Sequence, residues 1–279
     1  MRILLTGRNG QVGWELERKL APLGEVIATD RATLDLAEPD AIRRAVREAK
    51  PQIIVNAAAY TAVDQAESEP ELAMQINGSA PGVLAEEAKR LGALLVHYST
   101  DYVFDGEKAT PYLEDDPPNP INVYGKTKLE GERAIQAVGC RHLILRTSWV
   151  YGARGKNFLL TILRLASEGR ELRVVDDQIG APTASFAISQ ATAQLVRAGA
   201  RGLYHLCAAG AASWCGFARA ILAQAGIAAP VTAIRTEDYP TPARRPRNSR
   251  LDCTRLLKDH GLALAPWEEA LAEVTFAPR

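Results

Sequence analysis

Tyr124 and Lys128 stand four residues apart in the run Tyr-Gly-Lys-Thr-Lys. On a helix this spacing places both side chains on one face, one turn apart. A phenol has a reference pKa of about 10, so it releases its proton reluctantly at neutral pH. An ammonium ~5 Å away, at an effective dielectric of about 20, favours the phenolate by roughly 3 kcal/mol, or about two pKa units. The pair therefore predicts a general acid that protonates a carbonyl oxygen.

The bare Tyr124 and Lys128 spacing is also typical of a surface tyrosine and lysine on an amphipathic helix. Upstream hydroxyls strengthen the chemical interpretation, because Ser99 and Thr100 end an apolar run. A hydroxyl at the end of a strand can hydrogen-bond the substrate oxygen that receives the proton. Adjacent strand residues point to opposite faces, so only one of the two faces the substrate. We choose Thr100 and interpret Ser99 as a strand-end cap.

A second chemical pattern, Thr-Gly-Arg-Asn-Gly-Gln-Val-Gly, lies near the N-terminus, where Gly7, Gly10 and Gly13 follow a short apolar run. Glycine at such a strand-to-helix turn permits a tight bend and lets the backbone approach a pyrophosphate. The N-terminus of the following helix offers free N–H groups to phosphate oxygens. The pattern predicts a dinucleotide site, although a glycine triplet alone is weak evidence.

Acidic and small residues after the next two predicted strands extend this site. Asp30 ends the second strand, where a carboxylate can accept hydrogen bonds from the adenosine ribose. Arg31 beside it is suited instead to a 2′-phosphate, so the choice between NADH and NADPH stays open. Asp35-Leu36 are expected to bracket the adenine. The run Asn56-Ala57-Ala58-Ala59 ends the third strand where the cofactor crosses the sheet; simple tight packing also explains it.

Short β-rich runs alternate with helical patterns in the first half of the chain. Strands that are apolar on both faces and separated by helices predict a doubly wound parallel sheet of the α/β class. Ligands bind such a sheet beyond the carboxyl ends of its strands. The predicted strands are 2–6, 25–29, 53–56, 94–99 and 142–147, and the predicted helices are 11–20, 39–49, 71–91 and 123–137.

After Arg146 the alternation loosens. Helical patterns at 158–168, 185–198 and 213–224 are separated by β-like runs at 172–175, 203–206 and 231–234. We expect residues 1–148 to form the cofactor domain, with some returning C-terminal segments. Residues 149–279 are expected to form most of a smaller α/β substrate-binding lobe.

The composition excludes several function classes. Lys plus Arg equals Asp plus Glu at 33 each, so no net charge favours nucleic acid or an anionic membrane. The N-terminal apolar run is too short for a signal peptide or a membrane span. The four cysteines show no C-x-x-C spacing, which favours reduced thiols in a cytoplasmic protein over a zinc site.

One dense basic cluster lies near the C-terminus, in the run Pro-Ala-Arg-Arg-Pro-Arg-Asn-Ser-Arg that ends at Arg250. A nucleic-acid patch is conceivable, but overall neutrality and the intervening proline argue against it. Bidentate capture of a nucleotide-sugar diphosphate fits a few arginines better, and we single out Arg245 for it. A solvated loop would also account for any single arginine.

Together these residues resemble the extended short-chain dehydrogenase/reductase superfamily and, within it, the dTDP-4-dehydrorhamnose reductase family. The resemblance runs nearly the length of the chain and is highly specific in combination. Its further motifs are Asn-Ala-Ala-Ala-Tyr-Thr-Ala-Val-Asp at 56–64, Tyr-Ser-Thr-Asp-Tyr-Val-Phe-Asp-Gly at 98–106, Arg-Thr-Ser-Trp-Val-Tyr-Gly at 146–152, Gly-Ala-Pro-Thr at 180–183 and Pro-Thr-Pro-Ala-Arg-Arg-Pro at 240–246.

This resemblance implies a Rossmann-type fold and reduction of the C4 ketone of dTDP-4-dehydro-L-rhamnose by NADPH or NADH, the last step of dTDP-L-rhamnose synthesis. It implies that Tyr124 donates the proton, that Lys128 is its partner and also hydrogen-bonds the nicotinamide ribose, and that Thr100 tunes the acid. Thr100, Asp101 and Trp149 would contact the deoxysugar. The cofactor would be lined by Gly7, Gly10, Gln11, Val12, Gly13, Asp30, Arg31, Asp35, Leu36, Ala58, Ala59, Tyr60, Thr61, Tyr98, Tyr124 and Lys128.

One departure concerns metal binding. Some relatives bind Mg²⁺ through glutamates at a dimer interface. Glu15 matches one of these, but Phe186 stands where another is expected, and the C-terminal one has no clear counterpart. We therefore expect no metal, and a monomer or homodimer that does not rely on one.

Three other functions are open at this point. A related dTDP-4-keto-6-deoxysugar is an alternative substrate. A dehydratase or epimerase fits less well, because dehydratases usually carry Asp-Glu after the active-site threonine and this chain has Asp101-Tyr102. A non-catalytic regulatory subunit would keep the fold, but the intact set of Thr100, Tyr124 and Lys128 disfavours it.

Overall fold

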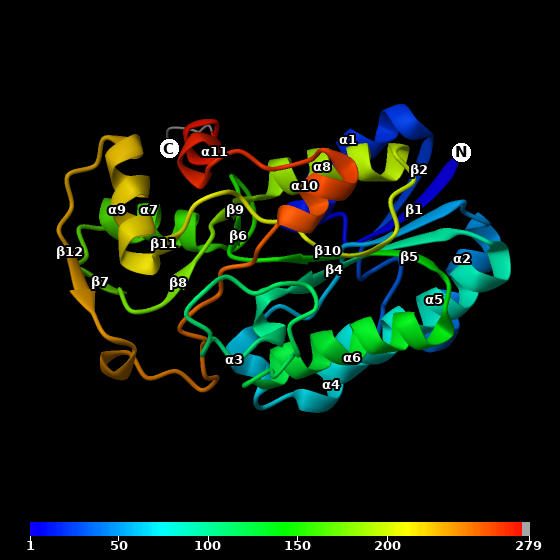
Figure 1. Ribbon diagram of the computed structural model, residues 1–279, viewed down its shortest axis with the longest axis horizontal. Coiled ribbons are helices and arrows are strands. Elements are labelled where there is room, and N and C mark those ends of the chain that lie inside the picture. The colour runs from blue at the N-terminus through cyan, green and yellow to red at the C-terminus, as the bar shows by residue number, and fades with distance from the viewer. Residues whose placement is uncertain (275–279) are drawn as a thin grey trace.

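A central sheet of parallel strands dominates the computed structural model, which describes residues 1–274 (Figure 1). The sheet order is β10-β5-β4-β3-β1-β2, and every pairing in it is parallel. Strand order reverses between β1 and β3, which is where such sheets bind ligands. This confirms the predicted doubly wound fold. The strands are β1 (Arg2–Thr6), β2 (Glu25–Thr29), β3 (Ile53–Asn56), β4 (Leu94–Thr100), β5 (Arg141–Thr147) and β10 (Gly202–His205).

Helices cover both faces of this sheet, as Figure 1 shows. Successive strand residues alternate between the two cores: Ile3 and Leu5 pack with α1 and α8, whereas Leu4 packs with α2 and α5. The covering helices are α1 (Gln11–Leu20), α8 (Ser185–Arg197) and α10 (Thr254–His260) on one face, and α2 (Pro39–Ala49), α5 (Ala80–Leu91) and α6 (Val123–Val138) on the other. Because helices cover both faces, a ligand is expected at the polar ends of the strands.

The expectation of one helix over 71–91 is wrong. The structure has a short helix α4 (Pro70–Met74), a π-helical turn over Gln75–Ser79, and then α5. The wide turn brings the backbone of Asn77 against α6, where a Cβ on Gly131 would lie 2.2 Å from the Asn77 carbonyl oxygen. It also aims the Asn77 amide at the backbone of Tyr60, which it both donates to and accepts from. Tertiary contacts therefore override the local helical pattern.

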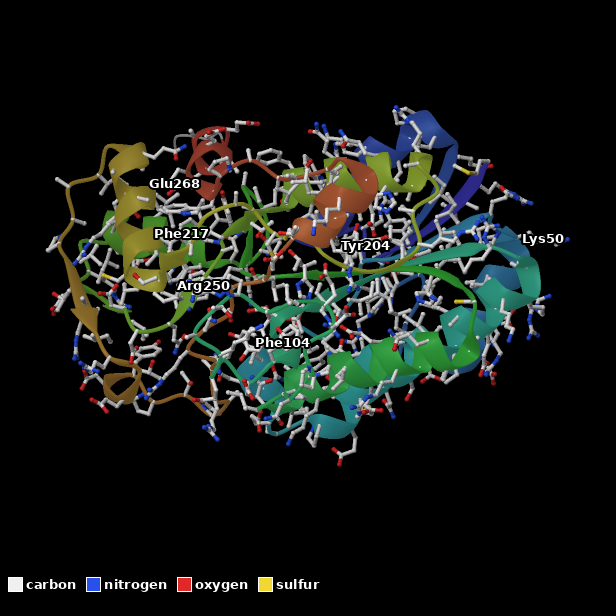
Figure 2. All side chains as sticks on the ribbon, viewed as in Figure 1. Lys50, Phe104, Tyr204, Phe217, Arg250 and Glu268 are labelled. Carbon is white, nitrogen blue, oxygen red and sulfur yellow. The ribbon has the colours of Figure 1, made fainter. Side chains whose placement is uncertain are left out.

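A smaller lobe with its own core occupies the left of Figure 1. Figure 2 places Phe217 in that lobe, away from Phe104 and Tyr204 in the larger part. Phe217, Tyr151 and Ile221 are fully buried there. Its elements are β6 (Val150–Tyr151), α7 (Phe158–Ser167), β7 (Leu172–Val175), β8 (Ile179–Gly180), β9 (Thr183–Ala184), β11 (Ala212–Ser213), α9 (Trp214–Ala225), β12 (Val231–Ile234) and α11 (Trp267–Ala272).

The polypeptide crosses between the two parts more than once. After the small lobe begins at β6, the chain returns to the larger part for α8, β10 and α10. Residues 275–279 of the predicted lobe lie outside the described residues. Among residues 1–274 the structure contains no helix that is both long and apolar enough to cross a membrane.

Candidate active site

Tyr124 lies in the first turn of α6, next to the end of β4. The helix begins at Asn122, whose side chain accepts a hydrogen bond from the Gly125 N–H at 2.8 Å, as an N-cap does. A Cβ on Gly125 would lie only 2.1 Å from the Tyr102 carbonyl oxygen, so glycine lets the helix touch the 3₁₀ turn 101–103. The Tyr124 and Tyr102 rings meet edge to face at 5.8 Å. The phenol is therefore held by both the helix cap and the strand end.

The expectation that the pKa of Tyr124 lies below its ordinary value is wrong for this structure. Burial raises the pKa of the Tyr124 phenol and the negative charge of Asp101 raises it further, whereas the neighbouring Thr100 hydroxyl opposes both effects. The spacing of Tyr124 and Lys128 carries no information on burial, which here outweighs a solvent-screened ammonium. A raised pKa keeps the phenol protonated at neutral pH, which is the state that a proton donor needs.

Asp101 is a buried carboxylate that directly follows β4. The Thr100 hydroxyl donates to its Oδ1 at 2.9 Å, whereas its Oδ2 has no hydrogen-bond partner within the described residues. Burial raises the pKa of Asp101 to about 6, against smaller opposing contributions from hydrogen bonds. An unpartnered buried oxygen at the strand end is consistent with the predicted contact to a sugar hydroxyl.

Asp101→Asn is expected to stabilise the fold at neutral pH. The folded-state pKa of about 6 lies above the ordinary value of 3.8, so ionised Asp101 destabilises the folded state at pH 7 by about 3 kcal/mol at most. The Asp101 carboxyl takes up its proton more readily in the folded state than in the unfolded state. The stability gained by Asp101→Asn should therefore shrink as the pH falls from 7 towards 4. Thermal unfolding at both pH values measures it.

A matched control is Asp105→Asn. Hydrogen bonds from Tyr112, Glu107 and Asn119 hold the pKa of Asp105 below its ordinary value. Its replacement should therefore destabilise the protein at pH 7. Equal effects of the two substitutions would contradict this account.

Lys128 is buried at 2% exposure, and its Nζ faces the sheet. Nζ donates to the Tyr98 carbonyl oxygen at 2.5 Å and lies 3.3 Å from Nε2 of His97. Burial lowers the pKa of Lys128 to about 8, and Glu132 partly opposes that shift. Its predicted bond to the nicotinamide ribose remains a prediction.

The glycine loop has the geometry of a phosphate-binding turn. Gly7 has a φ of 76°, in the left-handed region that favours glycine. A Cβ on Gly13 would lie 2.0 Å from the Gly7 carbonyl oxygen, so α1 packs directly against the turn. The α1 N-terminus therefore points its free N–H groups at the mouth of the loop, where a pyrophosphate fits.

Gly13→Ala is expected to weaken dinucleotide binding by about tenfold or more, because the loop and α1 must separate to admit the methyl group. Titration of reduced cofactor followed by nicotinamide fluorescence measures the dissociation constant. Gly82→Ala is the control: its Cβ would meet only the Ala134 side chain, at 3.2 Å, in a helix remote from the loop. A normal cofactor affinity in Gly13→Ala would exclude the loop as the phosphate site.

A cavity of about 380 Å³ lies beside this loop and gathers most of the predicted cofactor residues. These residues fit a dinucleotide, because the cavity joins the turn at Gly7, where φ is positive, to the carboxyl ends of neighbouring strands. The predicted residues that line it are Gly7, Asp30, Arg31, Asp35, Leu36, Ala58, Ala59, Tyr60 and Thr61.

Asp30 is more heavily engaged than the sequence indicated. One carboxylate oxygen accepts from the backbone of Ala32 and from both the backbone and the hydroxyl of Thr33, and the other accepts from Asn9 at 3.0 Å. These bonds lower its pKa. Asp30 therefore shapes the turn after β2, and a ribose hydroxyl would have to share its oxygens. Arg31 is exposed and pairs with Asp35 at 3.5 Å.

Two other predicted cofactor residues have structural partners. Gln11 accepts a hydrogen bond from Asn157 at 2.9 Å and so ties the start of α1 to the small lobe. The Tyr98 side-chain hydroxyl hydrogen-bonds the Thr192 hydroxyl of α8 at 2.7 Å, and the Tyr98 backbone carbonyl oxygen accepts from Lys128. Val12 packs at the edge of the core between α1 and α8.

On the substrate side, Trp149 lies on the connection after β5 with a φ of 47°, an unusual value for a bulky residue. Its ring stacks on Trp214 at 3.5 Å. Arg245 makes a bidentate pair with Asp64, at 2.8 Å for each bond, and also donates to the Ala243 carbonyl. The guanidinium predicted to bind a diphosphate is therefore engaged within the protein in this structure.

Sequence reasoning overlooked two contacts. His97 of β4 lies against Lys128 of α6. Cys207 and Cys253, which are distant in sequence, meet through the Cys207 N–H and the Cys253 sulfur at 3.4 Å. Neither contact has a local sequence signal. The His97–Lys128 contact forms when α6 packs on β4, and the Cys207–Cys253 contact forms when the C-terminal part of the chain returns to the sheet.

The model of the RmlD substrate binding domain family matches residues 1–277. The chain belongs to this family. A dTDP-4-dehydrorhamnose reductase from Burkholderia thailandensis is 50% identical to it, over 97% of each chain. Another, from Escherichia coli K12, is 47% identical over 96% of this chain and 95% of that protein.

A solved structure extends this similarity to three dimensions. The crystal structure of dTDP-4-dehydrorhamnose reductase from Bacillus anthracis in complex with NADP has a TM-score of 0.94 to this chain. It is 38% identical and covers 97% of this chain and 96% of that one. Membership in the RmlD substrate binding domain family confirms the resemblance inferred from the sequence.

Proposed function

We propose that this protein reduces the C4 ketone of dTDP-4-dehydro-L-rhamnose to dTDP-L-rhamnose with NADPH or NADH. The observation that carries the proposal is similarity over the full chain to dTDP-4-dehydrorhamnose reductases, in a structure that keeps Tyr124, Thr100 and Lys128 together around the end of β4. The similar structure that holds NADP supports the nicotinamide cofactor.

The reduced nicotinamide supplies the hydride, and the chain supplies the proton. Tyr124, kept protonated by burial, donates its hydroxyl proton to the oxygen of the ketone as that oxygen gains charge. The neighbouring Thr100 hydroxyl opposes the rise in the pKa of the phenol. The positive charge on Lys128 would favour the phenolate that remains after transfer.

We assign the cofactor to residues 1–148 and most of the nucleotide sugar to the lobe of residues 149–279. Asp101, which follows β4, and Trp149, which begins the assigned lobe, are proposed to contact the deoxysugar. Arg245 is proposed to position the segment around it through Asp64. The exposed side chains of Arg244 and Arg247, which have no hydrogen-bond or ion-pair partner within the described residues, are then the guanidinium groups available to a diphosphate.

An assay with purified protein tests the function. Absorbance of NADPH or NADH is followed after addition of dTDP-4-dehydro-L-rhamnose, and the sugar product is identified by NMR. Oxidation of cofactor with formation of dTDP-L-rhamnose is expected. Oxidation only with another dTDP-4-keto-6-deoxysugar would change the assigned substrate, and no oxidation with either would favour a regulatory subunit.

A further inference from the structure

A chain of buried polar side chains runs from the cofactor cavity to Lys128. Thr6, Asn56 and His97 are each about 1% exposed, and they come from the neighbouring strands β1, β3 and β4. The Ala58 N–H, at the cavity, donates to the Thr6 hydroxyl oxygen at 3.3 Å. The proposed mechanism uses none of these three side chains.

The hydrogen bonds along this series of side chains all run in one direction. The Thr6 hydroxyl donates to Oδ1 of Asn56 at 2.7 Å, and Nδ2 of Asn56 lies 3.1 Å from Nδ1 of His97. Because the Asn56 amide nitrogen can only donate, Nδ1 of His97 must accept. A neutral imidazole then carries its proton on Nε2, which is the nitrogen that faces Nζ of Lys128 at 3.3 Å.

This arrangement limits the protonation state of Lys128. An ammonium only donates, and two N–H groups cannot hydrogen-bond each other. The Nε2–H tautomer of His97 therefore suits a neutral amine, whose lone pair accepts from Nε2 while its own N–H donates to the Tyr98 carbonyl. A charged Lys128 can hydrogen-bond His97 only when the imidazole is in the other tautomer, which in turn requires the Asn56 amide to rotate so that Oδ1 accepts from Nδ1.

The other polar groups around Lys128 do not remove this constraint. Glu132 lies one turn further along α6, and its carboxylate is held by Arg146 of β5 at 2.6 and 2.9 Å. Tyr124 lies one turn earlier on the same helix, and Tyr98 presents its backbone oxygen from β4. Burial lowers the pKa of His97 well below its ordinary value, so the imidazole is neutral. His97 is thus the titratable side chain in direct contact with Nζ in the described residues.

We propose that His97 is a positioning residue for Lys128, and that Thr6 and Asn56 select the histidine tautomer offered to Nζ. The protonation state of Lys128 is thereby coupled to the orientation of the Asn56 side-chain amide. That amide is linked through the Thr6 hydroxyl to the Ala58 N–H at the cofactor cavity. This inference deepens the proposed function, because Lys128 belongs to the same site. It is not needed for that function to hold.

NMR of the apoprotein tests the tautomer without any substrate. Protein labelled with ¹⁵N-histidine gives long-range ¹H–¹⁵N correlations that distinguish Nδ1–H from Nε2–H, and the His97→Asn spectrum assigns the signal. Above about pH 8, where Lys128 is neutral, the Nε2–H form is expected; below it, the Nδ1–H form should replace it. A single tautomer across the titration of Lys128 would overturn the proposal, whatever the enzyme assay shows.

Asn56→Asp gives the kinetic test. The introduced carboxylate cannot donate, so it fixes the proton of His97 on Nδ1 and leaves a lone pair on Nε2 for the ammonium. The NMR spectrum should show Nδ1–H at every pH. The basic limb of the kcat profile should move up by about one pH unit, a tenfold change in proton concentration, with KM for the nucleotide sugar unchanged.

Thr6→Val is the second variant, in case a carboxylate at position 56 prevents folding. It removes the donor to Oδ1 of Asn56 and keeps a similar volume, so the amide can take either orientation. Both tautomers of His97 should then coexist at high pH. A wild-type spectrum in this variant, or an unmoved basic limb in Asn56→Asp, would contradict the selection of the tautomer by Thr6 and Asn56.

Discussion

Tyr124→Phe should lower kcat by roughly 100- to 10,000-fold, the range that general acid catalysis contributes. The substitution removes only the hydroxyl, and phenylalanine can keep the edge-to-face contact with Tyr102 at 5.8 Å. Since the phenol is protonated throughout the neutral range, its loss removes the donor at every accessible pH. Binding of the nucleotide sugar should change little. Single-turnover absorbance of the reduced cofactor measures the step.

Tyr102→Phe provides the matched control. Tyr102 is a neighbouring phenol whose pKa is also raised by burial and by Asp101. If the position of the hydroxyl on α6 decides activity, the Tyr102 variant should keep most of its turnover. Near-normal turnover in Tyr124→Phe, or an equal loss in both variants, would refute the assignment of the proton donor.

Glu132→Ala should destabilise the protein by about 3–5 kcal/mol, because it leaves a buried guanidinium without its counter-ion. Glu132 and Arg146 have side chains only 2% and 3% exposed and form two hydrogen bonds, at 2.6 and 2.9 Å. The pair joins α6, which carries Tyr124 and Lys128, to β5. Chemical denaturation measures the loss of stability.

Glu130→Ala on the same helix is the control. Glu130 pairs with Arg133 at the same 2.6 Å, but both side chains are about half exposed, so the pair should contribute less than about 1 kcal/mol. Replacing both members of the buried pair, as in Glu132→Leu with Arg146→Met, should recover much of the loss. Similar effects of Glu132→Ala and Glu130→Ala would show that burial does not govern the strength of these pairs.

The sheet and most helices could be predicted because their signals are local. The β1 and β2 segments are short apolar runs between turn residues, and the sequence pattern predicts both with the bounds that the structure shows. The break before α5 could not be predicted. The chain there leaves the α-helical path so that Asn77 can reach Tyr60, a contact made only after folding.

The chemistry of the site was predictable in residue type but not in electrostatics. The spacing of Tyr124 and Lys128 identified the pair, whereas the direction of the pKa shift of Tyr124 depends on burial and on Asp101 from another element. The pairing of Arg245 with Asp64 joins residues 181 positions apart. Such long-range partners decide which charges remain available, and no sequence pattern of this chain encodes them.

The stacked indoles of Trp149 and Trp214 have a practical consequence. Their planes are 5° apart and their centroids 3.5 Å apart, and one ring belongs to the connection after β5 while the other starts α9 of the small lobe. Chromophores this close couple their electronic transitions, so the pair should give an exciton signal in circular dichroism. Any shift of the connection after β5 against α9 on ligand binding would alter that signal, so the wild-type protein can report the shift without an added label.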